Sequence, residues 1–195
     1  MKNLEEVLKA AGNPVAMLRN SQIGAYVYPV VPGEFSNWRD EQAAWQKTAV
    51  LFDQSHHMVE QYVQGPDTLK LFTHLGMNSF ANFPVNRAKQ LAPCNYDGYV
   101  IGDVVLFHLE QNRFNLVGRP PVHNWVQYHA ETGKYDVKLD RDERTVARTG
   151  PNALTRKAYR FQVQGPNAMQ VIEKLLGGPA PEVKFFNWRT VTIAG

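Results

Sequence analysis

AVLFDQSHHM, residues 49–58, is the stretch around which the rest of the chain is organised. Residues 49–52 are apolar and predict a buried strand. The run from Asp53 to His57 that follows is entirely polar. A strand that turns polar at its C-terminal end can deliver side chains into a pocket, with its apolar part as rigid support. The alternative is a plain polar turn in which Asp53 and Ser55 bind backbone N–H groups.

The 195-residue chain has the composition of a globular protein, with 44% hydrophobic and 20% charged residues. Its net charge of +3 is mild and no dense run of Lys or Arg occurs, so we do not expect nucleic-acid binding. Cys94 is the single cysteine, which excludes an internal disulfide and a multi-cysteine zinc site. The acidic start is no signal peptide, and no apolar run is long enough to span a membrane, so we expect a cytoplasmic location.

Two helices are expected upstream of the central stretch. Residues 4–11 place apolar side chains on one helical face, and Asn3 can cap this helix. Residues 36–48 form the second helix, with Trp38 and Trp45 on its inner face. This second helix leads directly into the strand at residues 49–52.

Downstream, short strands alternate with helices and loops. Residues 76–98 are rich in Asn, Pro and Gly and predict loops. Residues 140–157 are highly charged with almost no periodicity, which indicates a solvated loop or a boundary between structural halves. The expected elements are strands over 58–64, 99–109, 113–121 and 135–139 and helices over 67–75 and 123–131.

An internal repeat links two parts of the chain. YVQGPD at residues 62–67 is echoed by FQVQGPN at residues 161–167, with the VQGP cores 100 positions apart (163 − 63). In each copy a strand meets a Gly-Pro turn and then an amphipathic helix. The repeat therefore predicts two related α/β units, with strands on one side of a layer and helices on the other.

The second unit does not finish within this sequence. Residues 185–194 read as a further apolar strand, and an exposed apolar strand at a terminus is a liability. We therefore expect an N-terminal portion of a longer protein. The expected organisation is a first unit over 1–140, a charged connecting loop over 141–157 and the start of the second unit over 158–195.

Several motifs resemble one protein family, in the order expected of it. LFDQSHHM, VQGPD, NYDGYVIGDVVLF and FNLVGR are similar to the folate-binding domain of the glycine-cleavage T-protein family. LRNSQIGAYVYPVV, VIGD and KFFN add a finer resemblance to the tetrahydrofolate-dependent aromatic O-demethylases of that family. The resemblance covers almost the whole chain and is weakest over residues 140–157.

The resemblance implies an α+β fold with antiparallel or mixed sheets and helices packed on them. It also implies a methyltransferase reaction. The methyl group of a methoxylated aromatic acid, of the vanillate, 3-O-methylgallate or syringate type, would pass to N5 of tetrahydrofolate. Such a displacement needs the methyl group held in line between the ether oxygen and N5 of tetrahydrofolate. It also needs a proton or hydrogen bond for the leaving phenolate. Aminomethyl transfer and a folate-binding module without catalysis remain as alternatives.

The same resemblance implies roles for individual residues. Tyr28, Gln54 and His57 match substrate-pocket positions of the O-demethylases, and Arg119 offers a fork suited to a benzoate carboxylate. Asp103 matches the second Asp of the family's Asp-Asp pair near the folate nitrogen, whereas Gly102 replaces the first; we expect Asp103 to orient the folate or help to move a proton. The alternatives are a buried structural acid for Asp103, a surface ion pair for Arg119 and packing for the tyrosines. Tyr26 is a weaker candidate on the face of Tyr28.

Two kinds of group are not expected in this sequence. His56 and His57 are adjacent on one strand and point to opposite faces, and no other cluster has ligand spacing, so we expect no metal site. The resemblance also implies that the main proton donor and the acid that binds the pterin ring lie downstream of residue 195. We therefore expect residues 1–195 alone to be inactive.

Overall fold

The computed structural model describes residues 3–20, 32–148 and 150–193. The chain divides into two units, Met1–Gly33 and Glu34–Gly195. Tyr26 and Tyr28 lie outside the described residues. The boundaries expected after residues 140 and 157 stay predictions.

The first unit contains two short helices, α1 (Leu4–Ala11) and α2 (Pro14–Arg19). The predicted cap at Asn3 is confirmed and forms a capping box with Glu6: the Glu6 N–H donates to Asn3 Oδ1 over 2.9 Å, and the Asn3 N–H donates to Glu6 Oε2 over 3.2 Å. Helix α2 was not expected. Asn13 caps it and Pro14 occupies its first turn, so the Gly-Asn-Pro that ends α1 also begins α2.

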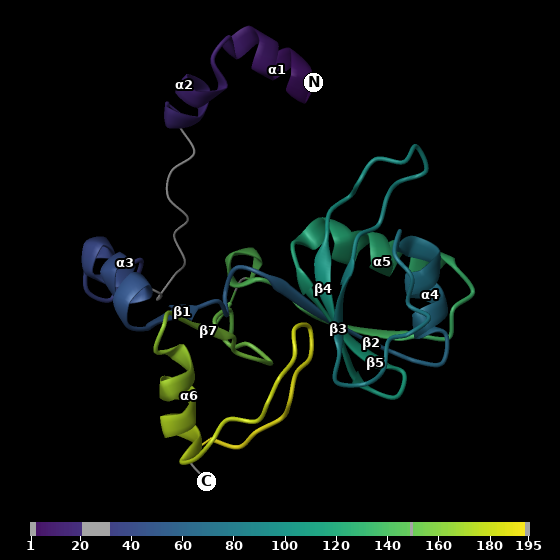
Figure 1. Ribbon diagram of the computed structural model, residues 1–195. Coiled ribbons are helices and arrows are strands. Elements are labelled where there is room, and N and C mark those ends of the chain that lie inside the picture. Colours follow the sequence, from purple (N-terminus) through teal and green to yellow (C-terminus); the bar gives the residue numbers. More distant parts are fainter. Residues whose placement is uncertain (1–2, 21–31, 149, 194–195) are drawn as a thin grey trace. The chain divides into compact units, whose positions relative to one another are not determined.

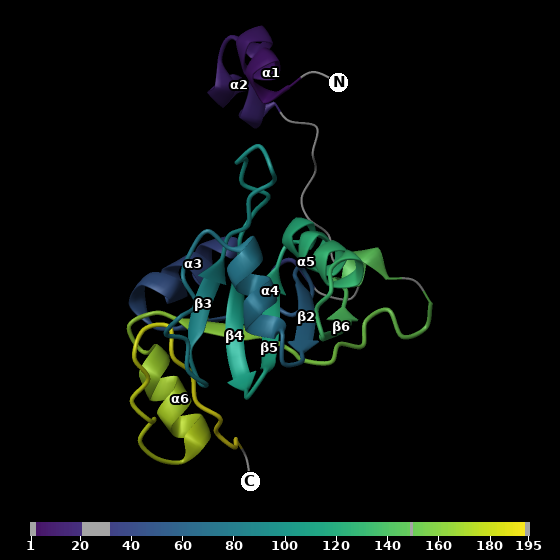
Figure 2. The same cartoon turned by 90° about the vertical axis from the view of Figure 1, so that its right-hand side faces the viewer.

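A five-stranded antiparallel sheet forms the centre of the second unit, in the strand order β3-β4-β5-β2-β6 (Figure 2). Helices α4 (Thr68–Leu75) and α5 (Pro120–Thr132) pack on one face of it. The strands are β2 Val59–Gln64, β3 Ala88–Leu91, β4 Val104–Glu110, β5 Arg113–Gly118 and β6 Lys138–Asp142.

The core lies between this sheet and the two helices. Alternation along the strands sends every second side chain toward the helices, and these side chains are buried. The core side chains include Val63, Leu71, Phe72, Leu106, Phe114, Leu116, Val122 and Val126. The prediction of an α+β fold with antiparallel sheets and packed helices is confirmed.

A separate two-stranded antiparallel sheet pairs β1 (Val50–Asp53) with β7 (Phe161–Gln164). Helix α3 (Trp38–Lys47) precedes β1, and helix α6 (Ala168–Leu176) follows β7 (Figure 1). The strand expected over residues 49–52 is present as β1, but its expected burial is wrong, because Leu51 is 62% exposed. The described residues place only one other strand beside β1 and bury no residue of α3 or α6.

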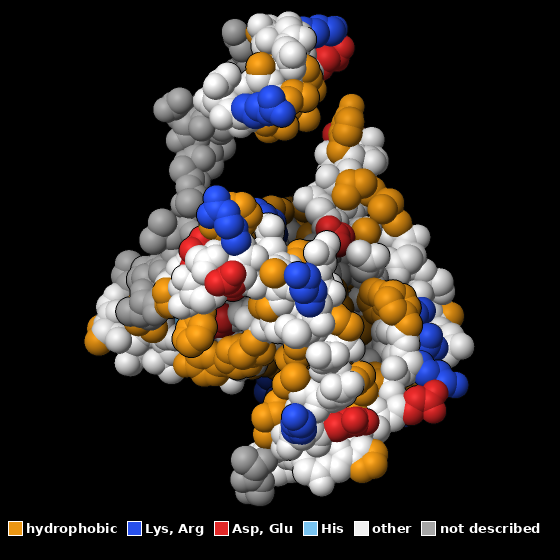
Figure 3. Space-filling model, turned by 60° about the vertical axis from the view of Figure 1, so that its left-hand side comes forward, with side chains coloured by type: hydrophobic (Ala, Val, Ile, Leu, Met, Phe, Trp, Pro, Cys, Tyr) orange, Lys and Arg blue, Asp and Glu red, His pale blue; other side chains and the backbone are white. Residues whose placement is uncertain are grey.

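The predicted inner face of α3 is also wrong. Trp38 and Trp45 are each about half exposed, although the Trp45 ring contacts the Phe52 ring edge to face at 5.9 Å. Figure 3, which brings the left-hand side of Figure 1 forward, shows apolar side chains exposed on this face. Helical spacing predicted an apolar stripe, but the described part of the chain supplies no layer to cover it.

Three other expectations need correction. Strand β3 interrupts the predicted loops at 76–98, and the strand predicted over 135–139 begins three residues later, at Lys138. Residues 140–157 are not a solvated loop throughout: Asp142, Thr145 and Arg156 are buried, and Thr145–Ala147 is a short 3₁₀ helix. Between residues 185 and 193 no strand forms, and only Asn187 bridges to Arg87.

The internal repeat is confirmed in its local structure. β2 with α4, and β7 with α6, each join through a glycine of positive φ, +149° at Gly65 and +128° at Gly165. In both copies, the last residue of the strand before the Gly-Pro turn pairs with a partner strand. Gln64 of β2 lies opposite Lys138 of β6, and Gln164 of β7 lies opposite Val50 of β1. β1 is therefore the counterpart of β6.

The two copies also touch each other at equivalent positions. Arg87 forms an antiparallel bridge with Asn187, which lies at the repeat offset of 100 positions (187 − 87). The Ala88 N–H donates to the Phe186 carbonyl over 2.8 Å, and the Trp188 N–H donates to the Asn86 carbonyl over 3.1 Å. The similarity thus extends about twenty residues beyond the Gly-Pro turns.

Candidate functional site

A cavity of about 620 Å³ lies against the sheet face opposite α4 and α5. Val105, Phe107 and Val117 form an apolar floor, because they alternate along β4 and β5 with side chains that face the helices. The other wall comes from the segment after β1 and from the start of β7. The volume is typical of a small-molecule site.

Three of the predicted site residues line this one cavity: Gln54, Asp103 and Arg119. They come from separate segments, just after β1, just before β4 and just after β5. The fold therefore brings together residues that lie up to 65 positions apart (119 − 54). Tyr26 and Tyr28 are outside the described residues, so their predicted roles stay untested.

Arg119 is the exposed residue between β5 and α5. His123 Nδ1 lies 2.9 Å from its carbonyl oxygen and fixes the backbone there. Within the described ranges, its guanidinium has no hydrogen-bond or ion-pair partner. The cavity thus holds an uncompensated cation that can bind a carboxylate in two-point fashion.

Asp103 differs from its prediction. It is exposed and precedes β4, so it is not a buried acid inside an apolar strand. The strand begins at Val104 because Gly102, with φ +156°, turns the chain immediately before it. Gln90 Nε2 donates to Asp103 Oδ2 over 3.2 Å, and the carboxylate remains accessible to a ligand in the cavity.

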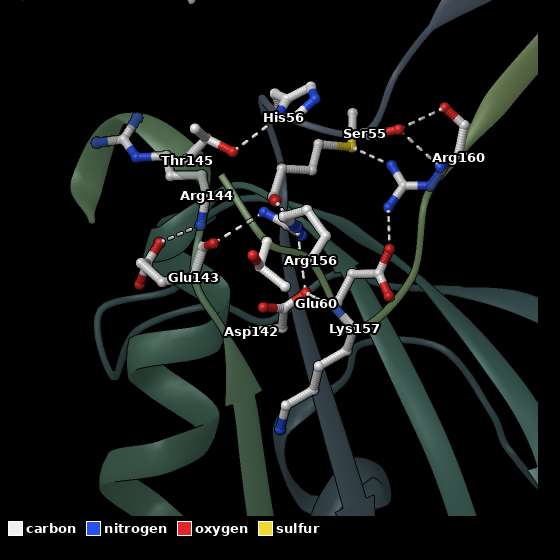
Figure 4. Close-up of polar contacts among 12 residues, drawn as sticks. Ser55, His56, Glu60, Asp142, Glu143, Arg144, Thr145, Arg156, Lys157 and Arg160 are labelled. Carbon is white, nitrogen blue, oxygen red and sulfur yellow. Dashed lines mark hydrogen bonds and ion pairs between the residues drawn. The ribbon is translucent and has the colours of Figure 1, made fainter. Parts of the chain in front are cut away.

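The turn after β1 is held by its own polar residues and by the segment before β7. The Ser55 N–H donates to Asp53 Oδ1 over 2.8 Å, and the Arg160 N–H donates to Ser55 Oγ over 2.9 Å. His56 Nδ1 lies 2.8 Å from Thr145 Oγ1 (Figure 4). Burial raises the pKa of Asp53, but the hydrogen bonds from Ser55 and the charge of His56 outweigh it and hold that pKa below its ordinary value.

Gln54 is positioned by the same segment. Its N–H donates to the Arg160 carbonyl over 2.8 Å, and its side-chain Nε2 lies 3.3 Å from Gln162 Oε1. His57 is half-buried and does not line the cavity, but its pKa is lowered by burial and then by the charges of Arg160 and Arg119. His57 is therefore held in its neutral form beside a positively charged site.

Arg160 is a cavity residue that reasoning from the sequence missed. Its Nη2 lies 2.6 Å from Oε1 of Glu60, a carboxylate whose side chain is 5% exposed. The repeat contained the signal: Glu60 and Arg160 occupy equivalent positions, 100 apart, in the two copies. Residues at equivalent positions meet where two related units face each other.

A buried ion-pair network closes the charged segment onto the sheet (Figure 4). Arg156, whose side chain is 0% exposed, pairs with Asp142 over 3.1 Å. It also donates to the carbonyls of Glu143 and Met58 over 2.8 and 3.1 Å. Because the Arg156 side chain is fully buried and contacts a carboxylate and two carbonyls, this arginine is structural and is not available to a ligand.

In residues 3–20, 32–148 and 150–193, no three His, Cys, Asp or Glu side chains gather so that they could hold a metal ion. The helices of these same ranges are all too short or too polar to cross a bilayer.

Comparison with known proteins gives consistent relatives. The chain is 55% identical over 194 residues to a syringate O-demethylase of a Sphingobium species, covering 100% of this chain and 41% of that protein. An aminomethyltransferase of Phocaeicola vulgatus is 28% identical over 165 residues, covering 85% of this chain and 42% of that one. The chain thus spans about two fifths of the length of these curated relatives.

A solved structure shows the same fold. The glycine cleavage system aminomethyltransferase T from Bartonella henselae matches with a TM-score of 0.58 and 21% identity, covering 76% of this chain and 37% of that one. The GCVT N-terminal domain family matches residues 18–195. The family predicted from the motifs is confirmed, and the chain belongs to the GCVT N-terminal domain family.

Proposed function

We propose that this chain carries the aromatic-substrate side of a tetrahydrofolate-dependent O-demethylase. The observation that carries the proposal is the guanidinium of Arg119, which has no partner among the described residues and lies beside an apolar floor in one cavity. An apolar cavity lined by a cation that has no partner among the described residues suits an aromatic acid, because the ring packs on the floor and the carboxylate meets the fork. The 55% identity to a protein named syringate O-demethylase supports a methoxylated benzoate as that acid.

The reaction proposed is methyl transfer from an aryl methyl ether. The bond between the methyl carbon and the aryl ether oxygen breaks, and its electron pair stays on that oxygen. The carbon forms a new bond to the acceptor nitrogen, which loses its proton, and the phenolate takes up a proton. Holding the methyl group in line between the two heavy atoms is the main contribution of the site.

Tetrahydrofolate fits the remaining features of the cavity. An exposed carboxylate, Asp103, stands at the edge of a floor formed by Val105 and Phe107. A flat heterocycle with N–H donors can pack on such a floor and donate to such an acid. When bound, tetrahydrofolate would supply the nitrogen that accepts the methyl group, and we propose that Asp103 holds it.

Roles for the other residues follow from their positions. Gln54 lines the cavity and is proposed to hydrogen-bond the ring hydroxyl or ether oxygen. His57, neutral because its pKa is lowered, is proposed to donate or accept a hydrogen bond at the substrate rather than to carry a charge. Tyr28, with Tyr26 as the weaker candidate, remains a proposed substrate contact.

The test is a substrate panel on the protein expressed from its complete reading frame. Vanillate, 3-O-methylgallate and syringate are each incubated with tetrahydrofolate, and the phenol and 5-methyltetrahydrofolate are measured. Arg119→Met is expected to raise the Kd of the preferred acid about 10- to 150-fold, since a charged hydrogen-bonded contact is worth about 1.5–3 kcal/mol. Arg113→Met, which removes an exposed ion pair with Glu110, is the matched control. An unchanged Kd in Arg119→Met would refute the carboxylate assignment.

Aminomethyl transfer is the second candidate, because another relative carries the name aminomethyltransferase at 28% identity. The substrate of such a reaction offers no free carboxylate-bearing aromatic ring to Arg119. Turnover of an aminomethyl donor with no turnover of the three aromatic acids would favour this candidate. Folate binding without either turnover would instead indicate a binding module.

A further inference from the structure

A second arginine lines the proposed substrate cavity. Arg160 enters from the residue before β7, on the wall opposite the strands that form the floor. Its side chain is 28% exposed, and its Nη2 contacts Glu60 over 2.6 Å. The acceptor of Nη1 is the Met58 thioether sulfur, 3.4 Å away, which is a weak acceptor (Figure 4). One edge of the guanidinium is therefore firmly bound, whereas the other can exchange its partner for a better acceptor.

Glu60 fixes the position of this guanidinium. Its carboxylate is buried and is contacted by the Asn115 Nδ2 at 3.2 Å and by the Tyr62 hydroxyl at 3.3 Å, in addition to Arg160. A carboxylate fixed by three donors fixes the plane of the guanidinium that binds it. The site thus carries an oriented cation whose position does not depend on the ligand.

Arg160 also stands beside the residue proposed to contact the ring oxygens. The Arg160 carbonyl accepts from the Gln54 N–H over 2.8 Å, and the Gln54 side chain reaches Gln162 two residues further along. Arg119 comes from a different element and would hold the carboxylate. An aromatic acid bound by Arg119 would then direct its ring oxygens toward the wall formed by Gln54 and Arg160.

We propose that Arg160 contacts the ring oxygen from which the methyl group leaves and stabilises the negative charge that develops there. This inference rests on the proposed O-demethylation. As the bond between methyl carbon and ring oxygen breaks, the electron pair remains on the oxygen, and an N–H of Arg160 exchanges the Met58 sulfur for that oxygen. The contact strengthens as charge builds, so it favours the transition state over the bound ether. Glu60 is the positioning residue of this arrangement.

The discriminating measurement is the dependence of turnover on the leaving group. A series of methoxybenzoates is prepared whose product phenols differ in acidity, and kcat is measured for each with the complete protein. Arg160→Met is expected to lower kcat about 100-fold or more for the least acidic phenol and less than about 10-fold for the most acidic one. The phenolate of an acidic phenol leaves without help from a cation. The kcat of the unsubstituted protein should therefore depend less on the acidity of the product phenol than the kcat of Arg160→Met does.

Controls separate this role from a structural one. Arg141→Met removes another partly buried arginine that pairs with a carboxylate, Glu143 at 2.8 Å, but lies outside the cavity lining, and it should leave the dependence unchanged. Since Arg160→Met leaves Glu60 buried without its cation, the double variant Glu60→Gln/Arg160→Met is measured too. Arg160→Lys, which keeps the charge but not the fork, should recover part of the lost turnover.

Each remaining outcome is decisive. An equal loss of kcat along the whole series, or an effect confined to the KM for tetrahydrofolate, would overturn the role of Arg160 while leaving the proposed function intact. Absence of turnover by the unsubstituted protein with every methoxybenzoate would overturn the proposed function and this inference with it.

Discussion

Alanine at Gly65 tests whether the Gly-Pro turn of the first copy needs its glycine. Gly65 has φ +149°, and a Cβ atom there would lie 2.2 Å from the Asp136 carbonyl oxygen and 2.9 Å from Val137 Cα. Both contacts are with backbone, immediately before the partner strand β6. The collision therefore cannot be relieved by a side-chain rotation, and β6 must move away from β2.

Two costs add up in Gly65→Ala. Backbone strain at a conformation that side chains rarely adopt costs about 1–3 kcal/mol. Displacing the start of β6 weakens at least two ladder hydrogen bonds, each worth about 0.5–1.5 kcal/mol. We expect the free energy of unfolding to fall by about 3–5 kcal/mol, which is at the upper end for a single substitution.

The assay is urea denaturation followed by circular dichroism, together with hydrogen exchange of the backbone amides. Gly98→Ala, at φ +83° with no atom within 4 Å, isolates the strain and should cost only about 1 kcal/mol. Gly178→Ala, without positive φ and with open space around it, should be nearly neutral. Gly65→Ala should also speed exchange in β6 before other strands.

The reasoning fails if Gly65→Ala costs no more than Gly98→Ala. The second copy provides an internal check. A Cβ at Gly165 would lie 2.5 Å from the Thr48 carbonyl oxygen, just before β1, so Gly165→Ala should speed exchange in β1 and β7 while leaving the five-stranded sheet unaffected.

Two further perturbations follow from the charges. The pKa of His57 is lowered from 6.5 in the folded chain, so the unfolded chain binds more protons at pH values between the folded pKa and 6.5. The stability that comes from neutral His57 is therefore complete above pH 6.5 and is lost as the pH falls through that window. His57→Gln should flatten the dependence of the free energy of unfolding on pH in that window, measured by urea titrations at a series of pH values. Arg156→Met removes one buried partner of the Asp142 carboxylate, which keeps Arg148, and also removes the donors to two carbonyls. It should lower the free energy of unfolding by about 3–5 kcal/mol, measured by the same denaturation, whereas Arg113→Met, at an exposed ion pair, should cost less than about 1 kcal/mol.

The local structure was largely predictable because side-chain periodicity and turn residues act over short distances. The strand at residues 59–64, the helix that follows Gly65-Pro66 and a strand beginning at Arg113 were all expected from alternation and turn chemistry, although the last one ends at Gly118 and not at residue 121. The repeat of VQGP correctly paired the two copies. Each of these inferences needs only neighbours in the chain.

Burial was less predictable, because it depends on what covers a face. The apolar residues of β1 were expected inside, yet Leu51 faces outward in a two-stranded sheet. Asp103 was expected inside a strand and is exposed before one. The candidate site was predicted for Gln54 and Arg119 through family resemblance, whereas Arg160 was missed because its importance arises from a pairing with Glu60 across 100 positions.

The pairing of β1 with β7 can form only late in the synthesis of the chain. Val50 and Gln164 pair although they are 114 positions apart (164 − 50). At about 5–20 residues per second, a ribosome needs about 6–23 s to make the chain between them. The five-stranded sheet can close once Asp142 has emerged, whereas β1 waits with both edges open and Leu51 exposed. Nascent β1 is therefore the segment that a chaperone must shield or that a neighbouring nascent chain can capture.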